Sequence, residues 1–274
     1  MAKKLNTNSN AYTLTYAAVL VVLVAFLLAF VSSALKPQQD ANVAIDKKQQ
    51  ILAALGVRDI AKSEVEQQYD QLIHADESYV LNAQGEAIEG DPFEVDTKEL
   101  GTKYPVFIAD NAQGEEVFVF CLKGRGLWGG LWGYLAYDPA TEKVTGAYFN
   151  HESETAGLGA LIKDQPFQDQ FIGRPVFDEQ GQVALTVVKK GAAETDFQVD
   201  GVTGATLTSK GVGEMVNSNL KAYMQVFAQY ASESAAQGCQ AHEGCQAHEG
   251  CQAGHCDKPA DQQCQHCKNH ANEE

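Results

Sequence analysis

The sequence predicts an α+β protein in which one N-terminal transmembrane helix precedes an extracytoplasmic domain with a mostly antiparallel sheet and flanking helices. Three observations predict this class. An uncharged apolar segment lies near the N-terminus, β-forming runs bounded by turn formers fill the middle of the 274-residue chain, and a helical hydrophobic period returns from Ser209. Strands followed by a closing helix are typical of an α+β domain.

The N-terminal apolar segment is long enough to cross a membrane. No charged residue occurs between Lys4 and Lys36, and a crossing needs roughly 20 mostly apolar residues. We expect a transmembrane helix over about residues 12–34. Because Lys3 and Lys4 precede it, the N-terminus is expected in the cytoplasm and the rest of the chain outside. A cleaved signal peptide, with a small-residue cleavage site at 31–34, is the competing interpretation.

Two amphipathic helices are expected after the membrane segment. Apolar residues at helical spacing over 43–55 predict the first, and Gly56 stands where it would stop. The second is expected from Ser63, as its N-cap, to Ile73.

Five β-rich runs are expected to form strands. Turn formers at 111–114 and 138–141 separate consecutive runs, as in hairpins. Cys121 lies within one run and is expected to be a buried core thiol. The runs cover residues 105–108, 117–122, 131–137, 144–149 and 183–188.

These patterns divide the chain into four segments. They are a membrane anchor (1–36), a helical prelude (37–100), the sheet-containing domain (101–232) and a Cys/His-rich tail (233–274). The tail has too few apolar residues for a core and is expected to be disordered.

The tail also leaves metal binding open as a class of function. Cys264 and Cys267 have the Cys-x-x-Cys spacing of a thiolate pair. Outside the cytoplasm, however, closely spaced thiols are readily oxidised to disulfides. We therefore favour the absence of a fixed metal site. Among the cysteines and histidines that alternate along the tail, Cys264 and Cys267 are the metal candidates.

The charge of the chain excludes nucleic acid as a partner. Its formal net charge is -16, whereas binding to phosphate backbones is driven by clustered Lys and Arg.

A segment rich in Gly and Thr precedes the closing helix. Its small residues let an anion approach the backbone, and a helix start favours negative charge. Plain turn chemistry and N-capping would also explain it, and neither Walker nor Rossmann spacing is present. Its residues are Asp200, Gly201, Val202, Thr203, Gly204, Ala205, Thr206, Leu207, Thr208 and Ser209.

This segment resembles the flavinylation motif of the FMN-binding domain family: Asp, two residues, Ser or Thr, then Gly-Ala-Thr. The resemblance implies covalent FMN, joined by a flavin transferase through a phosphoester to the last threonine of the motif, which is Thr206 here. It also implies cofactor-binding roles for neighbouring positions, namely Asp200, Thr203, Gly204, Ala205 and Thr208.

Two upstream segments resemble the same family. Residues 151–159 are similar to its His...Glu-Thr-Pro-Gly-Leu-Gly loop near the flavin ring, with Ala156 in place of Pro. Thr155 and Leu158 are therefore candidate ring contacts. Residues 126–134 resemble its glycine-rich Gly-Leu-Trp segment, which makes Trp128 a candidate contact, although an aromatic residue there could equally fill a core.

The resemblance covers the chain from the membrane segment to about Tyr230 and favours the branch formed by the C subunits of sodium-translocating NADH:quinone reductases. It implies an electron relay without a catalytic acid or base, in a bacterial inner-membrane complex with its main domain in the periplasm. That complex is an oxidoreductase and translocase whose other subunits would be the partners. It couples NADH oxidation and ubiquinone reduction to sodium transport. The G subunit of the Rnf electron-transport complex and a structural assembly protein are the alternatives.

Overall fold

The computed structural model describes residues 9–240, without the side chains of residues 228–240. The chain divides into two units, Met1–Tyr230 and Ala231–Glu274. Of the second unit, only the last residues of helix α4 are described. The predicted tail over 233–274 therefore lies mostly outside the described residues, as do Cys264 and Cys267.

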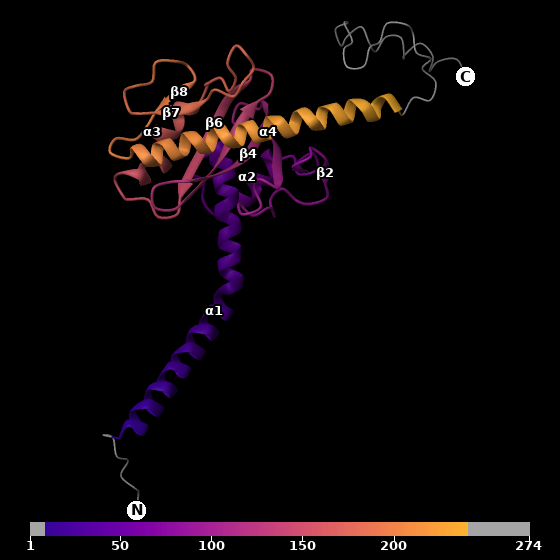
Figure 1. Cartoon of the computed structure of the whole chain (residues 1–274). Coiled ribbons are helices and arrows are strands. Elements are labelled where there is room, and N and C mark those ends of the chain that lie inside the picture. Colours follow the sequence, from indigo (N-terminus) through magenta and orange to yellow (C-terminus); the bar gives the residue numbers. More distant parts are fainter. Residues whose placement is uncertain (1–8, 241–274) are drawn as a thin grey trace, which may run out of the picture. The chain divides into compact units, whose positions relative to one another are not determined.

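A six-stranded antiparallel sheet forms the centre of the first unit, in the order β2-β1-β3-β4-β5-β6. Strands β2, β4 and β6 of this sheet are labelled in Figure 1. The turns predicted at 111–114 and 138–141 join β3 to β4 and β5 to β6. Two of the strands belong to the segment 37–100, for which the sequence predicted only helices. The strands are β1 (Tyr79–Asn82), β2 (Ala87–Ile88), β3 (Lys103–Asp110), β4 (Glu116–Arg125), β5 (Gly130–Asp138) and β6 (Lys143–His151).

Alternation along β4 divides its side chains between two cores. Phe120 and Leu122 belong to one core, and Val119 and Cys121 to the other, because successive side chains of a strand point to opposite faces. Cys121 is 5% exposed, which confirms the prediction of a buried thiol. Burial raises the pKa of this thiol to about 12.

Helix α4 (Thr206–Gln240) covers the first core. The apolar side chains that repeat at helical spacing after Ser209 are buried from Val212 to Tyr223, and the Tyr223 hydroxyl donates to the Pro105 carbonyl at 3.0 Å. Short elements close the same core: the 3-10 helices η1 (Gly159–Lys163) and η2 (Asp169–Phe171), helix α3 (Gln165–Gln168), and the parallel strands β7 (Thr186–Val188) and β8 (Gln198–Asp200).

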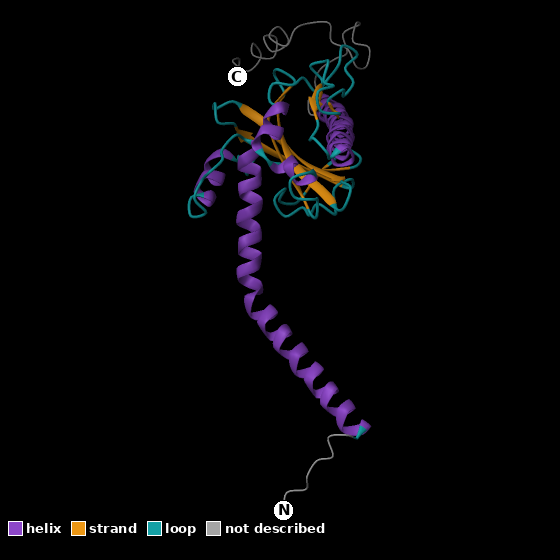
Figure 2. Ribbon diagram, turned by 90° about the vertical axis from the view of Figure 1, so that its left-hand side faces the viewer, coloured by secondary structure: helices purple, strands orange, loops and turns teal. Residues whose placement is uncertain are grey.

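Helices α1 (Asn10–Ala54) and α2 (Val65–Leu72) close the second core on the opposite face of the sheet (Figure 2). A Cβ on Gly146 of β6 would lie 2.0 Å from the Ala54 carbonyl oxygen, so the end of α1 rests directly on this strand. The predicted N-cap Ser63 is wrong. Helix α2 begins one residue later, behind Glu64, whose side chain makes no capping hydrogen bond.

Helix α1 joins the membrane segment and the first amphipathic helix, which the sequence predicted as separate elements. Pro37 lies inside it, where proline removes one hydrogen bond of the helical ladder and favours a bend; α1 is visibly bent in Figure 2. The predicted crossing at 12–34 lies within its apolar part, which is long and apolar enough to span a membrane and is exposed in the protein. Its last turns, including Ile51 and Leu52, are buried in the second core.

Candidate functional site

Thr206 is the first residue of α4, and it is exposed. The Ala205 carbonyl accepts the amide of Ser209 at 2.9 Å, so the helix starts three residues before the position predicted from sequence. Because alanine has no side-chain acceptor, it does not cap the free amides of the first turn. These amides and the helix dipole favour an anion beside Thr206.

Two glycines shape the loop that leads into α4. Gly204 has a φ of +75°, and a Cβ on it would lie 2.8 Å from Cδ2 of Leu158. A Cβ on Gly201 would lie 2.7 Å from the Val188 carbonyl oxygen. The loop therefore packs closely against two other segments at these glycines, and it leaves Thr203 exposed between them.

Asp200 holds a neighbouring loop. Its Oδ1 accepts the backbone N–H groups of Gly191, Ala192 and Ala193 at 2.8, 3.2 and 3.2 Å. The carboxylate of Asp200 is thus engaged in hydrogen bonds with the backbone of the 191–193 loop. A role of Asp200 in recognition by a flavin transferase stays a prediction.

A cavity of about 400 Å³ borders Thr206. It lies where the loops after the parallel strands β7 and β8 meet the start of α4, a place where phosphates bind in many α/β proteins. Lys189, Lys190 and Lys210 line it. Lys210 is 3.4 Å from Glu214, whereas no carboxylate among residues 9–227 forms an ion pair with the other two lysines. In a chain of net charge -16, this cavity attracts anions.

Thr208 is buried, and its hydroxyl donates to Oε2 of Glu154 at 2.7 Å. The other carboxylate oxygen accepts the backbone N–H of Trp128 at 2.9 Å. Burial alone would raise the pKa of Glu154, but hydrogen bonds from these and two neighbouring groups hold its pKa below the usual range. One carboxylate therefore joins the three segments that the sequence singled out separately, although sequence reasoning did not select Glu154 itself.

The same three segments carry exposed apolar side chains. Trp128 is 67% exposed, Leu207 59%, Leu127 49% and Leu158 42%. Trp128 is thus not a core residue, which removes the alternative left open by the sequence. Large exposed apolar groups on converging segments indicate a binding surface. Leu127 and Leu207 were missed from sequence because nothing in their spacing distinguishes them from core leucines.

Thr155 is exposed and shapes its own loop. Its carbonyl accepts the amides of Leu158 and Ala160, each at 3.1 Å. The structure therefore places it beside Leu158, in agreement with their pairing as candidate contacts.

His151 supports this loop from the end of β6. Its Nδ1 accepts the backbone N–H of Glu154 at 3.2 Å, so Nε2 carries the proton in the neutral ring. Nε2 is buried and has no hydrogen-bond partner within the described part of the chain. Burial lowers the pKa of His151, which favours this neutral form.

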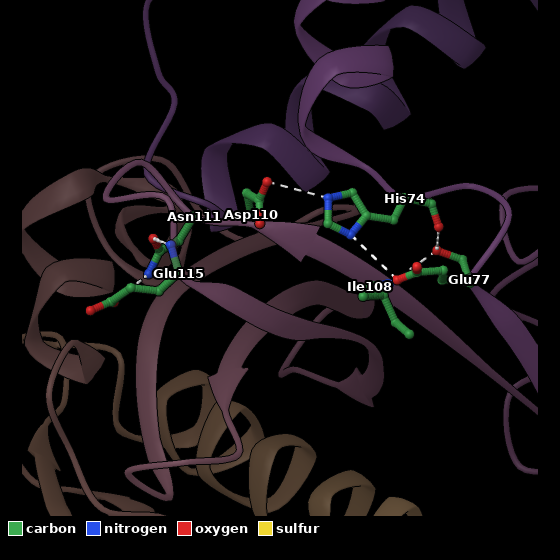
Figure 3. A network of polar contacts seen from close by, with 7 residues as sticks. His74, Glu77, Ile108, Asp110, Asn111 and Glu115 are labelled. Atoms are coloured by element: carbon green, nitrogen blue, oxygen red, sulfur yellow. Dashed lines mark hydrogen bonds and ion pairs between the residues drawn. The ribbon is translucent and has the colours of Figure 1, made fainter. Parts of the chain in front are cut away.

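A second polar group lies between the α2–β1 connection and β3 (Figure 3). His74 Nε2 is 3.2 Å from Asp110, and its Nδ1 is 3.6 Å from Glu77. His74, Glu77 and Glu116 offer ligand atoms within 4.8 Å of one another. Because both ring nitrogens already face carboxylates, we interpret this group as a surface network and assign no metal to it.

Comparisons with known proteins agree with this geometry. The FMN-binding domain family matches residues 126–221, which include all three segments. The C subunit of the Na(+)-translocating NADH-quinone reductase from Haemophilus ducreyi is 32% identical over 229 residues, covering 76% of this chain and 89% of that protein. The C subunit from Pseudomonas aeruginosa is 28% identical over 239 residues, covering 77% of this chain and 92% of that protein.

A solved structure shows the same relationship. The crystal structure of the C subunit of this reductase from Parabacteroides distasonis matches with a TM-score of 0.64 and 39% identity, covering 70% of this chain and 96% of that one.

Proposed function

This chain belongs to the family formed by the C subunits of the Na(+)-translocating NADH-quinone reductases, and we propose from this premise that it is a membrane-anchored electron relay whose FMN is joined through a phosphoester to Thr206. The relatives described above are C subunits of this reductase, which favours this branch over the G subunit of the Rnf complex.

The position of Thr206 carries the proposal. It is an exposed hydroxyl at an uncapped helix start, next to a lysine-lined cavity and to an apolar surface. A flavin mononucleotide has the matching chemistry, since it combines an anionic phosphate with a large planar aromatic ring system whose faces pack against apolar side chains. The residues present therefore fit the cofactor.

When bound, FMN supplies the redox chemistry of the site. The chain holds the cofactor in place and sets the polarity and charge around it. The amides of the first turn of α4 and the cavity lysines offset the charge of the phosphoester. Leu158, Leu207 and Trp128 provide apolar contact for the ring and exclude water from it.

We extend the proposal to the setting of the relay. Helix α1 anchors the chain in the bacterial inner membrane, with Thr206 on the periplasmic side. A flavin transferase attaches the cofactor, and the other subunits of the reductase exchange electrons with it, in a complex that couples quinone reduction to sodium export. The positive charge of Lys3 and Lys4 before the apolar segment supports this orientation. A reporter that is active only in the cytoplasm, fused after Tyr230, should be inactive. Its activity would contradict the periplasmic orientation.

Intact mass measurement of the full chain, co-expressed with a flavin transferase, tests the attachment. We expect the wild-type chain to gain the mass of FMN less water. Thr206→Ala should abolish the gain, because it removes the oxygen that carries the bond. Thr206→Ser is the matched control, since it keeps an oxygen at the same position of the first turn of α4, and it should keep the adduct. An adduct persisting on Thr206→Ala, or none on the wild type, would refute the proposal.

A further inference from the structure

Glu154 is a buried carboxylate at the meeting point of three chain segments. It is 8% exposed. Its Oε1 accepts from the Trp128 amide at 2.9 Å and its Oε2 from the Thr208 hydroxyl at 2.7 Å. Each oxygen thus holds a different segment, and both bonds have the short distances of hydrogen bonds to an ionised acceptor.

The surroundings of Glu154 are shaped to the carboxylate. A Cβ on Gly126 would lie 2.3 Å from its Oε1, and a Cβ on Gly159 would lie 2.5 Å from its Oε2. Any larger residue at either glycine would displace the carboxylate or the segment. Two glycines from separate loops therefore leave the space that this group occupies.

Glu154 also places a negative charge inside the site. Its lowered pKa keeps it ionised at neutral pH, and it forms no salt bridge within residues 9–227. Thr208, which donates to it, lies in the same first helical turn as Thr206. The charge of Glu154 therefore lies beside the helical turn that carries Thr206, where it acts on a group attached to that residue.

We propose that Glu154 is a positioning residue for the flavin: it fixes Trp128 and the first turn of α4 around the cofactor and keeps an uncompensated negative charge beside it. The inference rests on the proposed attachment of FMN to Thr206. Its electrostatic consequence is a lower midpoint potential, because reduction adds electrons next to an existing anion. A role of Glu154 confined to folding stability would leave that potential unchanged in a folded Glu154→Gln chain.

The test compares Glu154→Gln with Glu152→Gln in the full chain carrying attached flavin. Glu152 is a matched control, because it lies in the same loop and also accepts a backbone N–H, that of Gly130 at 3.1 Å, but it is exposed. We expect the midpoint potential of Glu154→Gln to rise and that of Glu152→Gln to stay at the wild-type value. Loss of attachment confined to a folded Glu154→Gln chain would likewise support the positioning of Thr206. Equal potentials in the two variants would overturn the inference.

A second pair of variants tests the role of Glu154 if Glu154→Gln does not fold. Thr208→Val removes only the hydroxyl bonded to Glu154, whereas Thr208→Ser keeps it. We expect Thr208→Val to change the flavin absorption spectrum and the potential, and Thr208→Ser to restore both. Identical behaviour of the two variants would overturn the inference. An absence of flavin from the wild-type chain would instead refute the proposed function, so the two failures are distinguishable.

Discussion

Gly204→Ala separates the cost of a strained loop from the loss of a flavin contact. Gly204 has φ +75°, and an added Cβ would lie 2.8 Å from Cδ2 of Leu158. Gly114 has nearly the same conformation, φ +78°, but a Cβ there would meet nothing within 4 Å. Gly114→Ala is therefore a control that has the backbone strain without the clash.

The expected loss of stability is similar for both variants. Placing an L-residue in the left-handed region costs roughly 1–2 kcal/mol. For a domain of this size, this corresponds to a drop of about 2–8 °C in unfolding temperature. The additional contact in Gly204→Ala is with the end of a flexible side chain that is 42% exposed. Leu158 can therefore move away at little cost to folding.

The effect on the flavin should be confined to Gly204→Ala. If FMN is attached as proposed, displacement of Leu158 would remove an apolar contact of the ring and shift the loop that precedes Thr206. We expect slower flavin attachment and a changed visible absorption spectrum, measured beside thermal unfolding by circular dichroism. The reasoning is refuted if Gly114→Ala perturbs the flavin as much as Gly204→Ala, or if neither variant perturbs it.

Three further predictions concern the lysines of the cavity, the contact between the end of α1 and β6, and the pH dependence of stability. Exchanging Lys189 and Lys190 together for Gln should slow flavin attachment at low ionic strength, because it removes two cavity cations. Exchange of Lys221, which is exposed and lies outside the cavity, should not slow attachment. Added salt should narrow the difference in attachment rate between the wild type and the double variant, because it screens the charges of the two lysines. Gly146→Ala should cost about 1–3 kcal/mol in urea unfolding, because its Cβ would collide with the carbonyl of Ala54. Glu154 has a folded pKa below its unfolded value, so its stabilising contribution is present above the unfolded pKa and is lost as pH falls through the folded one. The stability advantage of the wild type over Glu154→Gln should therefore shrink on acidification below about pH 4.3, and an advantage that grew in acid would contradict this assignment.

The sequence predicted the elements whose signal is local and long. The apolar N-terminal helix, four of the sheet strands, two hairpin turns and the face of α4 follow from hydrophobic period and turn residues. Short elements escaped detection. Strands β2 and β8 have two and three residues, too few for a period to show. Strand β1 is held by its pairing with β3, and β2 by its pairing with β1. Helix α4 begins at Thr206, before the start at Ser209 that the sequence predicted. Ser209 does not cap the helix, because it lies within the first turn and its Oγ accepts the Val202 amide.

The site was determined in part by sequence and in part by tertiary structure. The motif around Thr206 and the loops at 126–134 and 151–159 could be chosen from their residues, and so could Thr155, Leu158 and Trp128. Only the folded chain shows that Trp128 is exposed and that Asp200 holds its own neighbouring loop.

Glu154 lies in the loop that the resemblance covers, but only tertiary structure shows which groups it contacts. Its partners Trp128 and Thr208 lie 26 residues before it and 54 residues after it. No periodic pattern or spacing rule links residues so far apart, because the hydrophobic period describes one helix or strand at a time. The contact arises where β5, β6 and α4 pack together, and it is there that a carboxylate with one acceptor oxygen for each neighbouring segment becomes buried, ionised and hydrogen-bonded.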